Sequence, residues 1–411
     1  KALSANDRQR IEDIVNVHRQ RIFTPDAAGR YWENFFAWPM KIVEWNEKVG
    51  LVMPFYDKKF FFSGVDPQWP FIKDGQEKNG KWFSSAKLYN RFVPDNQKGN
   101  LLTRLHMCLK IARAIRRLHA AGLAHSDLSY NNVLVDPLTG NACIIDCDGL
   151  VVPKKFPPEV VGTPGFIAPE VMATRTLPLQ DPKKNLPQIS TDRHALAVLI
   201  YTFLLQRHPL DGGKVWDVND TAHDDDLRYG EKALFIEHPY DAANRVKSSQ
   251  LDPHELPQGD PQQRPYTLCG PYLTRLFNRA FVEGLHAPAR RPSAAEWEDA
   301  LVKTCDLLQP CNCEQGWYVF DNTTQPKCPF CGKPYAGQLP VLDSVSAMIE
   351  VGIDAAIVAV PTVFHEEAAL ALAEAGVHAL VEKPLAASVE SGQRVADAFK
   401  SAGLIGAVGY V

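Results

Sequence analysis

Two neighbouring stretches decide the fold of the larger part of this 411-residue chain: His125-Ser-Asp127-Leu-Ser-Tyr-Asn-Asn132-Val-Leu-Val and Ile144-Ile-Asp146-Cys-Asp148-Gly149-Leu. Short β-like runs at 133–135 and 142–145 flank a turn at 137–140, which predicts a hairpin with a polar loop at each end. Moving a γ-phosphoryl group requires a carboxylate that orients the attacking hydroxyl, and amide and carboxylate oxygens that hold Mg²⁺. Asp127, Asn132 and Asp146 can supply this set on one metal ion.

These stretches resemble the catalytic and metal-binding loops of the protein kinases, H-R-D-L-x-x-x-N and D-F-G. The resemblance implies that Asp127 is the base and that Asn132 and Asp146 bind the metal. Asp148 stands where the family has glycine and would add a second carboxylate toward the nucleotide's cation. A lone H-x-D is more often a solvated turn. Three further segments, however, follow in the family's order: Gly162-Thr-Pro-Gly-Phe-Ile-Ala-Pro-Glu170, Thr191-Asp192-Arg-His-Ala-Leu-Ala-Val-Leu-Ile-Tyr201 and Arg291-Pro-Ser293.

The three segments resemble the end of an activation segment, the helix whose buried Asp192 braces the catalytic loop, and the Arg291 that pairs with Glu170. Helical spacing of apolar residues surrounds them at 6–17, 101–121 and 192–206, and Gly122 predicts a C-cap. The resemblance therefore implies a kinase-like fold with a mainly helical C-lobe.

Finer features resemble one bacterial branch of kinases that carry a zinc-ribbon tail: Phe36-Ala-Trp-Pro39, Leu51-Val-Met-Pro-Phe-Tyr56 and Phe281-Val-Glu-Gly-Leu-His286. That branch includes the kinase of the tellurite-resistance-associated (TerY-type) phosphorylation triad. The resemblance implies a protein substrate and, as partners, a von Willebrand A-domain protein and a PP2C-type phosphatase.

The segment after the β-like runs at 40–44 and 50–53 is predicted to contact the base of ATP. If Met53 lies at the back of the site, Pro54 can offer only a carbonyl, since it has no N–H. The exocyclic amine of adenine needs such an acceptor, and Tyr56 could supply a backbone N–H to the ring. The alternative is that Met53 and Pro54 merely end a strand.

Two departures from the family pattern bear on activity. Ser126 replaces the usual Arg, so a phosphorylated activation segment would lose its guanidinium partner. The chain opens with Lys1 rather than Met and shows no signal peptide, so we expect a fragment. The Gly-rich loop and phosphate lysine should precede the 6–17 helix, and Lys1 stands only 11 residues before Glu12. We therefore expect a truncated N-lobe that binds ATP and transfers phosphate poorly.

Four of the nine cysteines lie in one polar segment at 309–337: Cys311, Cys313, Cys328 and Cys331. A C-x-x-C turn followed by Gly presents two thiolates from one knuckle, and four thiolates suit a closed tetrahedral Zn²⁺ site. The alternative, unconnected buried cysteines, lacks a core in which to bury them. We predict a structural zinc ribbon.

Residues 342–411 change to an Ala- and Val-rich alternation of strands and helices. Pro361-Thr-Val-Phe-His365 and Glu382-Lys383-Pro384 resemble the later half of the nucleotide-binding domain of the Gfo/Idh/MocA oxidoreductases, in which the motif Lys takes part in catalysis. The strand at 354–360 is predicted to be buried. The segment lacks G-x-G-x-x-G and a first β-α-β unit, so we do not expect NAD(P) binding. We expect a chimeric or artificial joint.

Composition places the chain in a common class. The formal net charge is -4, and no apolar run reaches the ~18 residues of a spanning helix, so neither nucleic acid nor membrane is predicted as a partner. Scattered cysteines beside one clustered set favour a reducing compartment, and we predict the cytoplasm.

The sequence as a whole predicts an α+β chain with four parts: a remnant of the kinase N-lobe and hinge at 1–56, a C-lobe at 57–308, the zinc ribbon at 309–337 and a partial Rossmann-like segment at 342–411. The predicted activity is Mg-ATP phosphotransfer to a Ser/Thr hydroxyl of a protein. Two alternatives stay open: a pseudokinase scaffold that binds partners through the C-lobe and ribbon, and an NAD(P)-dependent oxidoreductase.

Overall fold

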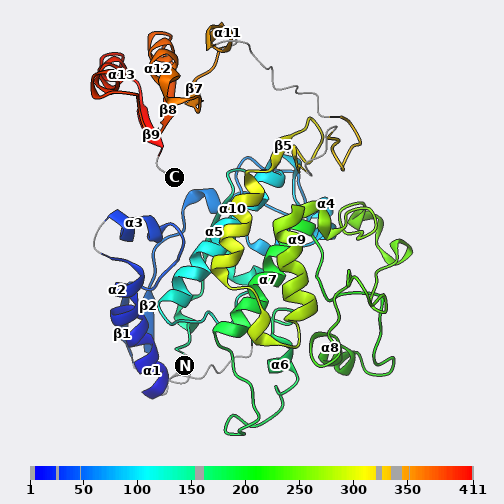
Figure 1. Cartoon of the computed structure of the whole chain (residues 1–411). Helices are drawn as coiled ribbons and strands as arrows, with labels where there is room; N and C mark the ends of the chain where they lie inside the picture. Colours follow the sequence, from blue (N-terminus) through cyan, green and yellow to red (C-terminus); the bar gives the residue numbers. More distant parts are fainter. Residues whose placement is uncertain are drawn as a thin grey trace. The chain divides into compact units, whose positions relative to one another are not determined.

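The computed structural model describes residues 5–24, 27–46, 48–152, 162–320, 326–334, 345–350 and 352–409. The chain divides into two compact units, residues 1–335 and 336–411. Helices dominate the first unit, and short strands accompany them in both (Figure 1). The predicted α+β class is confirmed.

The N-terminal part of the first unit is a helical stretch from Ala5 to Ile22, then a separate short helix and a hairpin. Its elements are α1 (Ala5–Glu12), a π-helical stretch (Asp13–His18), α2 (Arg19–Ile22), α3 (Ala27–Glu33), β1 (Lys41–Trp45) and β2 (Lys48–Val52). The strands pair antiparallel, with Lys41 opposite Val52. Glu12 pairs with Arg8 at 3.2 Å, and Lys1 lies outside the described residues.

The helical part of the first unit is built round α5. Its elements are α4 (Ala86–Phe92), α5 (Leu101–Ala120), α6 (Pro169–Met172), α7 (Ile189–Leu205), α8 (Thr221–Tyr229), α9 (Gly270–Asn278), a π-helical stretch (Arg279–Glu283) and α10 (Ala294–Cys305). A reciprocal cap between Asn100 and Thr103 starts α5. Gly122, at a φ of +77°, follows its end. α5 packs against α7 and α10, and α9 against α10 (Figure 1).

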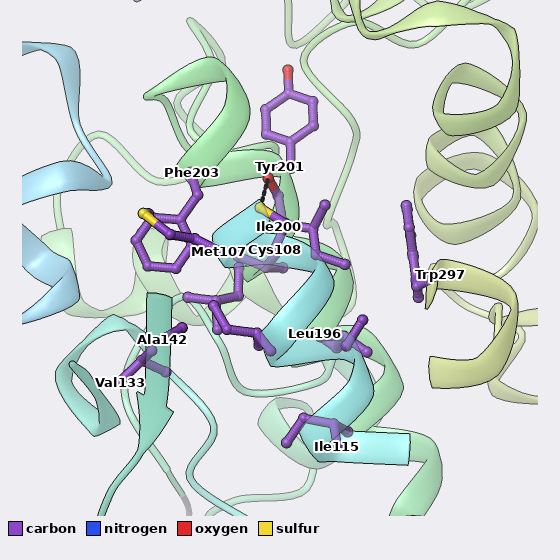
Figure 2. Close-up of a cluster of buried hydrophobic side chains, with 14 of the residues drawn as sticks. Met107, Cys108, Ile115, Val133, Ala142, Leu196, Ile200, Tyr201, Phe203 and Trp297 are labelled. Carbon is purple, nitrogen blue, oxygen red and sulfur yellow. Dashed lines mark hydrogen bonds between the residues drawn. The ribbon is translucent and has the colours of Figure 1, made fainter. Parts of the chain in front are cut away.

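The core of this unit lies where α5 crosses α7 and the hairpin of β3 (Val133–Asp136) and β4 (Asn141–Ile144). Figure 2 shows side chains from these elements and α10 meeting there, among them Met107, Ile115, Val133, Leu196, Phe203 and Trp297. The Cys108 thiol lies 4.0 Å from the Ile200 carbonyl oxygen. α7 is apolar on nearly all sides and buried on nearly all sides. None of the helices described here is both long enough and apolar enough to cross a bilayer.

The cysteine segment belongs to the same compact unit as the helices. Strands β5 (Leu308–Pro310) and β6 (Trp317–Val319) pair antiparallel, with Leu308 opposite Val319, and both of these side chains join the main core. The Leu101 N–H, at the start of α5, donates to the Gln315 carbonyl at 3.1 Å. The segment is therefore fixed to the helices by apolar packing and hydrogen bonds.

The second unit is a three-stranded parallel sheet in the order β7-β8-β9. Its elements are α11 (Val345–Glu350), β7 (Ala355–Val358), α12 (His365–Glu374), β8 (His378–Glu382), α13 (Val389–Ser401) and β9 (Gly406–Gly409). Val358, Val381 and Phe399 share a small core with both long helices. The prediction of a buried strand at 354–360 is wrong, because Ile357 is 69% exposed. Helices cover only one face of the described sheet.

Candidate active site and cysteine cluster

Asp127 lies at the centre of a hydrogen-bonded loop. Its Oδ1 accepts from the Thr163 N–H at 2.6 Å and from the Thr163 hydroxyl at 2.7 Å. Asn132 Nδ2 donates to Asp127 Oδ2 at 3.0 Å and to the Asp127 carbonyl at 2.7 Å. Because the amide nitrogen of Asn132 is used in this way, its side-chain oxygen is left for another ligand.

Asp192, at the start of α7, fixes the backbone of this loop through hydrogen bonds. Its carboxylate is 2% exposed and accepts from the backbone N–H groups of His125 at 2.6 Å and Ser126 at 3.1 Å. His119 Nε2 lies 3.2 Å from the same carboxylate. Ser126 has a φ of +68°, a strained conformation for a non-glycine residue that these bonds hold.

Asp146 and Asp148 bring two carboxylates together after β4. Asp146 has a φ of +60°, and the Ile145 N–H before it donates to the Asn132 carbonyl at 3.0 Å. Burial raises the pKa of the Asp146 carboxyl, and the charge of Asp148 raises it further. Two neighbouring carboxylates fit a divalent cation, which would relieve the repulsion between their charges. Asn132, Asp146 and Asp148 are the residues that would hold Mg²⁺.

The predicted adenine-contacting residues lie against the hairpin. Met53 and Tyr56 pack against an apolar cluster that includes Leu134, two residues after Asn132, and Cys143. Burial raises the pKa of the Tyr56 phenol. The Pro54 carbonyl and the Tyr56 N–H make no hydrogen bond within the described chain. Both backbone groups are thus available to a ligand.

A buried ion pair fixes the segment that follows Thr163. Arg291 is 2% exposed and donates to both Glu170 carboxylate oxygens, at 2.8 and 2.7 Å. It also donates to three backbone carbonyls, including that of Ser190 at 3.1 Å. The pairing between Arg291 and Glu170 expected from the sequence is therefore present in the structure.

A cavity of about 420 Å³ opens beside the catalytic loop. Its lining includes Tyr130, three residues after Asp127, and Gly165 and Phe166, which follow Thr163. Residues after α7, among them Arg207 and His208, form another part of the lining. Asp127 itself does not line this cavity, which meets its loop at Tyr130.

The four cysteines form a compact cluster. Their sulfur atoms all lie within 4.8 Å of one another. The Sγ atoms of Cys311 and Cys331 are 3.6 Å apart, and those of Cys313 and Cys328 are 3.8 Å apart. A tetrahedral Zn²⁺ with bonds of ~2.3 Å separates its sulfur ligands by about 3.8 Å. The donor set and spacing fit zinc, with no position left for substrate.

The comparisons with known proteins agree with this geometry. Residues 87–256 match the family model of the protein kinase domain. Serine/threonine-protein kinase dkf-2 of Caenorhabditis briggsae is 27% identical over 33% of this chain and 11% of its own length. Serine/threonine-protein kinase PLK4 of Xenopus laevis is 34% identical over 26% of this chain and 10% of its own. The rat dual specificity testis-specific protein kinase 1 is 41% identical over 17% of this chain and 12% of its own.

The chain therefore spans about a tenth of the length of these curated relatives. Residues 312–410 match a second family model, the oxidoreductase family with an NAD-binding Rossmann fold (GFO_IDH_MocA). The two matches agree with the two resemblances seen in the sequence. The bacterial TerY-type branch is a finer statement that neither match addresses.

Sequence reasoning missed several residues of the site. Thr163 lies inside the 162–170 motif, but the sequence does not reveal that both of its polar groups bind Asp127. Gln206, Arg207 and His208 line the cavity but follow a helix with no motif of their own. The sequence signal that could have found them is a run of polar residues directly after an apolar helix.

Proposed function

We propose that residues 1–335 are a protein-kinase-type phosphotransferase that moves a phosphoryl group from Mg-ATP to a Ser/Thr hydroxyl of a protein. The observation that carries this proposal is the loop in which Asp127 is held by Asn132 and Thr163 and braced by Asp192.

In this proposal Asp127 orients the acceptor hydroxyl and receives its proton, because its carboxylate lies on the loop beside the cavity. Asn132, Asp146 and Asp148 hold the cation, which neutralises charge on the transferring phosphoryl group. The Pro54 carbonyl and the Tyr56 N–H form hydrogen bonds to the adenine ring of ATP. Thr163 keeps Asp127 in one orientation, which limits the acceptor to one approach.

The finer assignments extend the same proposal. We place the kinase in the bacterial branch with a zinc ribbon, with a von Willebrand A-domain protein and a PP2C-type phosphatase as partners and the cytoplasm as its location. Weak activity of this chain stays a prediction. Residues 153–161, where activation-segment phosphorylation would act, lie outside the described residues.

The predicted absence of NAD(P) binding is not supported by the match of residues 312–410 to an NAD-binding family. We retain it as a proposal because the second unit has three parallel strands in its described part and its sequence holds no G-x-G-x-x-G. Calorimetric titration of the full chain with NADH tests it directly. A dissociation constant in the micromolar range would refute it.

The test of the main proposal is transfer of ³²P from labelled Mg-ATP to casein by the full chain. We expect Asp127→Asn to lower the rate by roughly 10²–10⁴-fold. Asp299→Asn is the matched control, since Asp299 is exposed on α10 and pairs with Lys303 away from the loop. Equal rates for the chain and Asp127→Asn would refute the assignment of the base. No transfer by the unmodified chain, with ATP still bound, would favour the scaffold alternative.

A further inference from the structure

Gln206, Arg207 and His208, which directly follow α7, form hydrogen bonds to three different segments around the cavity beside the catalytic loop. The Gln206 carbonyl accepts from the Ala86 N–H, at the start of α4, at 2.7 Å. His208 Nε2 donates to the Gly165 carbonyl, in the segment after Thr163, at 2.9 Å. His208 Nδ1 accepts from the Leu210 N–H at 3.2 Å, which fixes the ring tautomer. Arg207 binds the third of these segments, at 258–266.

Arg207 is a buried cation with every side of its guanidinium used. It donates to the Gln258 carbonyl at 3.1 Å and to the Arg264 carbonyl at 2.7 Å. It also pairs with Glu237 at 2.6 Å and contacts the Tyr201 hydroxyl at 3.2 Å. Because an unpaired buried charge is strongly unfavourable, Arg207 ties the cavity wall to the 258–266 segment.

Arg264 carries the connection on to the cysteine cluster. Its guanidinium donates to the Pro329 carbonyl at 3.3 Å and to the Phe330 carbonyl at 3.4 Å. It also lies over the Phe330 ring, 4.5 Å from the centroid. Pro329 and Phe330 are the two residues between Cys328 and Cys331, so their placement depends on the knuckle that the metal closes.

We propose that Arg264 and Arg207 are positioning residues that couple the four-cysteine metal site to the cavity beside the catalytic loop, where the acceptor protein would bind. With Zn²⁺ bound, the turn between Cys328 and Cys331 fixes the side chain of Arg264. The Arg264 carbonyl in turn fixes the guanidinium of Arg207, and residues 206–208 keep their positions in the cavity wall. Loss of the metal frees this wall. The acceptor then binds more weakly, while the nucleotide side, built on Asp146 and the hairpin, is unaffected. The coupling is independent of catalysis; only its effect on the acceptor rests on the proposed function.

Hydrogen exchange of the full chain, measured by mass spectrometry with and without Zn²⁺, tests the coupling without any activity. We expect chelation of the metal to speed exchange at 326–334, at 258–266 and at 206–213, by roughly fivefold or more in the last segment. Exchange in the β3–β4 hairpin should not change. Faster exchange confined to the cysteine segment would overturn the proposal.

Substitutions separate Arg264 from the metal itself. We expect Arg264→Ala, with one zinc per chain confirmed by elemental analysis, to reproduce the faster exchange at 206–213. Arg264→Lys should recover part of the protection, since it restores the charge but not both carbonyl contacts. Phe330→Ala is a milder second variant in case Arg264→Ala fails to fold. Arg279→Ala is the control, because Arg279 pairs with Glu296 outside this path. Normal exchange at 206–213 in zinc-loaded Arg264→Ala and Phe330→Ala would refute the path.

Kinetics give the functional readout. With casein as acceptor, Arg264→Ala should raise the KM for casein about tenfold while kcat and the KM for ATP stay within about twofold. An equal fall in kcat with unchanged KM would contradict a positioning role. A chain that transfers no phosphate at all would refute the proposed function, and the exchange experiment would still decide the coupling.

Discussion

At the scale of single residues, Asp148 places a second carboxylate after β4, where the kinase family has glycine. This difference has a measurable effect. Burial and the charge of Asp148 raise the pKa of Asp146. A carboxyl whose pKa is raised in the folded chain lowers the free energy of unfolding as the pH rises. This loss begins near pH 4, the ordinary pKa of the carboxyl in the unfolded chain. Asp148→Asn should therefore stabilise the metal-free chain at pH 7 and flatten its melting temperature between pH 4 and 7.

The same variant should respond less to Mg²⁺ in the presence of ATP, because one of two carboxylates facing the cation is gone. Melting temperatures measured with and without Mg²⁺ over that pH range provide both comparisons. If Asp148→Asn matched the unmodified chain in pH dependence and in Mg²⁺ response, Asp148 would have no part in the cation site.

His194 predicts a second pH effect. Its side chain is 1% exposed, and neither ring nitrogen has a hydrogen-bond partner among the described residues. Burial, aided by Arg291, holds its pKa well below the usual range. Below about pH 6.5 the His194 side chain is protonated in the unfolded chain but not in the folded chain. The free energy of unfolding therefore falls as the pH decreases.

We expect His194→Phe, which keeps an aromatic edge against Phe281, to reduce the slope of stability between pH 6.5 and 5. The measurement is the free energy of unfolding from denaturant titrations at several pH values. The slope is compared rather than the absolute stability, because the larger ring changes packing. An unchanged slope would show that His194 is not the group that titrates.

At the scale of elements, the buried pair of Arg291 and Glu170 joins α6 to the segment before α10. Glu170→Gln leaves a buried guanidinium without its counter-charge, which should lower the free energy of unfolding by roughly 3–5 kcal/mol. Glu296→Gln, in an exposed pair with Arg279, should lower it by about 0–1 kcal/mol. All eight tryptophans precede residue 318, so tryptophan fluorescence reports unfolding of the first unit alone. Similar losses for both variants would contradict this account.

Elements with strong local signals were predictable from the sequence. Apolar spacing placed the helix at 101–121, which the structure has at Leu101–Ala120, and two short β-like runs around a turn placed the β3–β4 hairpin. The prediction for β7 failed because a run of Ala, Ile and Val shows apolar character but not whether a second layer covers it. The contacts of Thr163 and Arg264 join residues far apart in the chain, which no local pattern reveals.

At the scale of the whole molecule, the second unit keeps an open apolar face. Ile357, Leu380 and Ala407 are neighbours across the three strands, and all three side chains are exposed. Parallel sheets are ordinarily covered on both faces, so this face should promote self-association. We expect Ile357→Thr with Leu380→Thr to lower self-association measured by light scattering.

Because these side chains are exposed, the double variant should change stability by no more than about 0.5 kcal/mol per site, judged by hydrogen exchange of the β8 amides. Val381→Thr, on the covered face at 1% exposure, is the destabilising control. Undiminished association in the double variant would show that another surface is responsible.

A thermal-shift titration of the chain with Mg-ATP is the most direct test of whether residues 1–335 assemble a kinase-type site. We predict stabilisation that requires Mg²⁺ and is lost in Asp146→Ala, with NADH as the control ligand. No shift with Mg-ATP, an equal shift in Asp146→Ala, or a shift with NADH alone would contradict it.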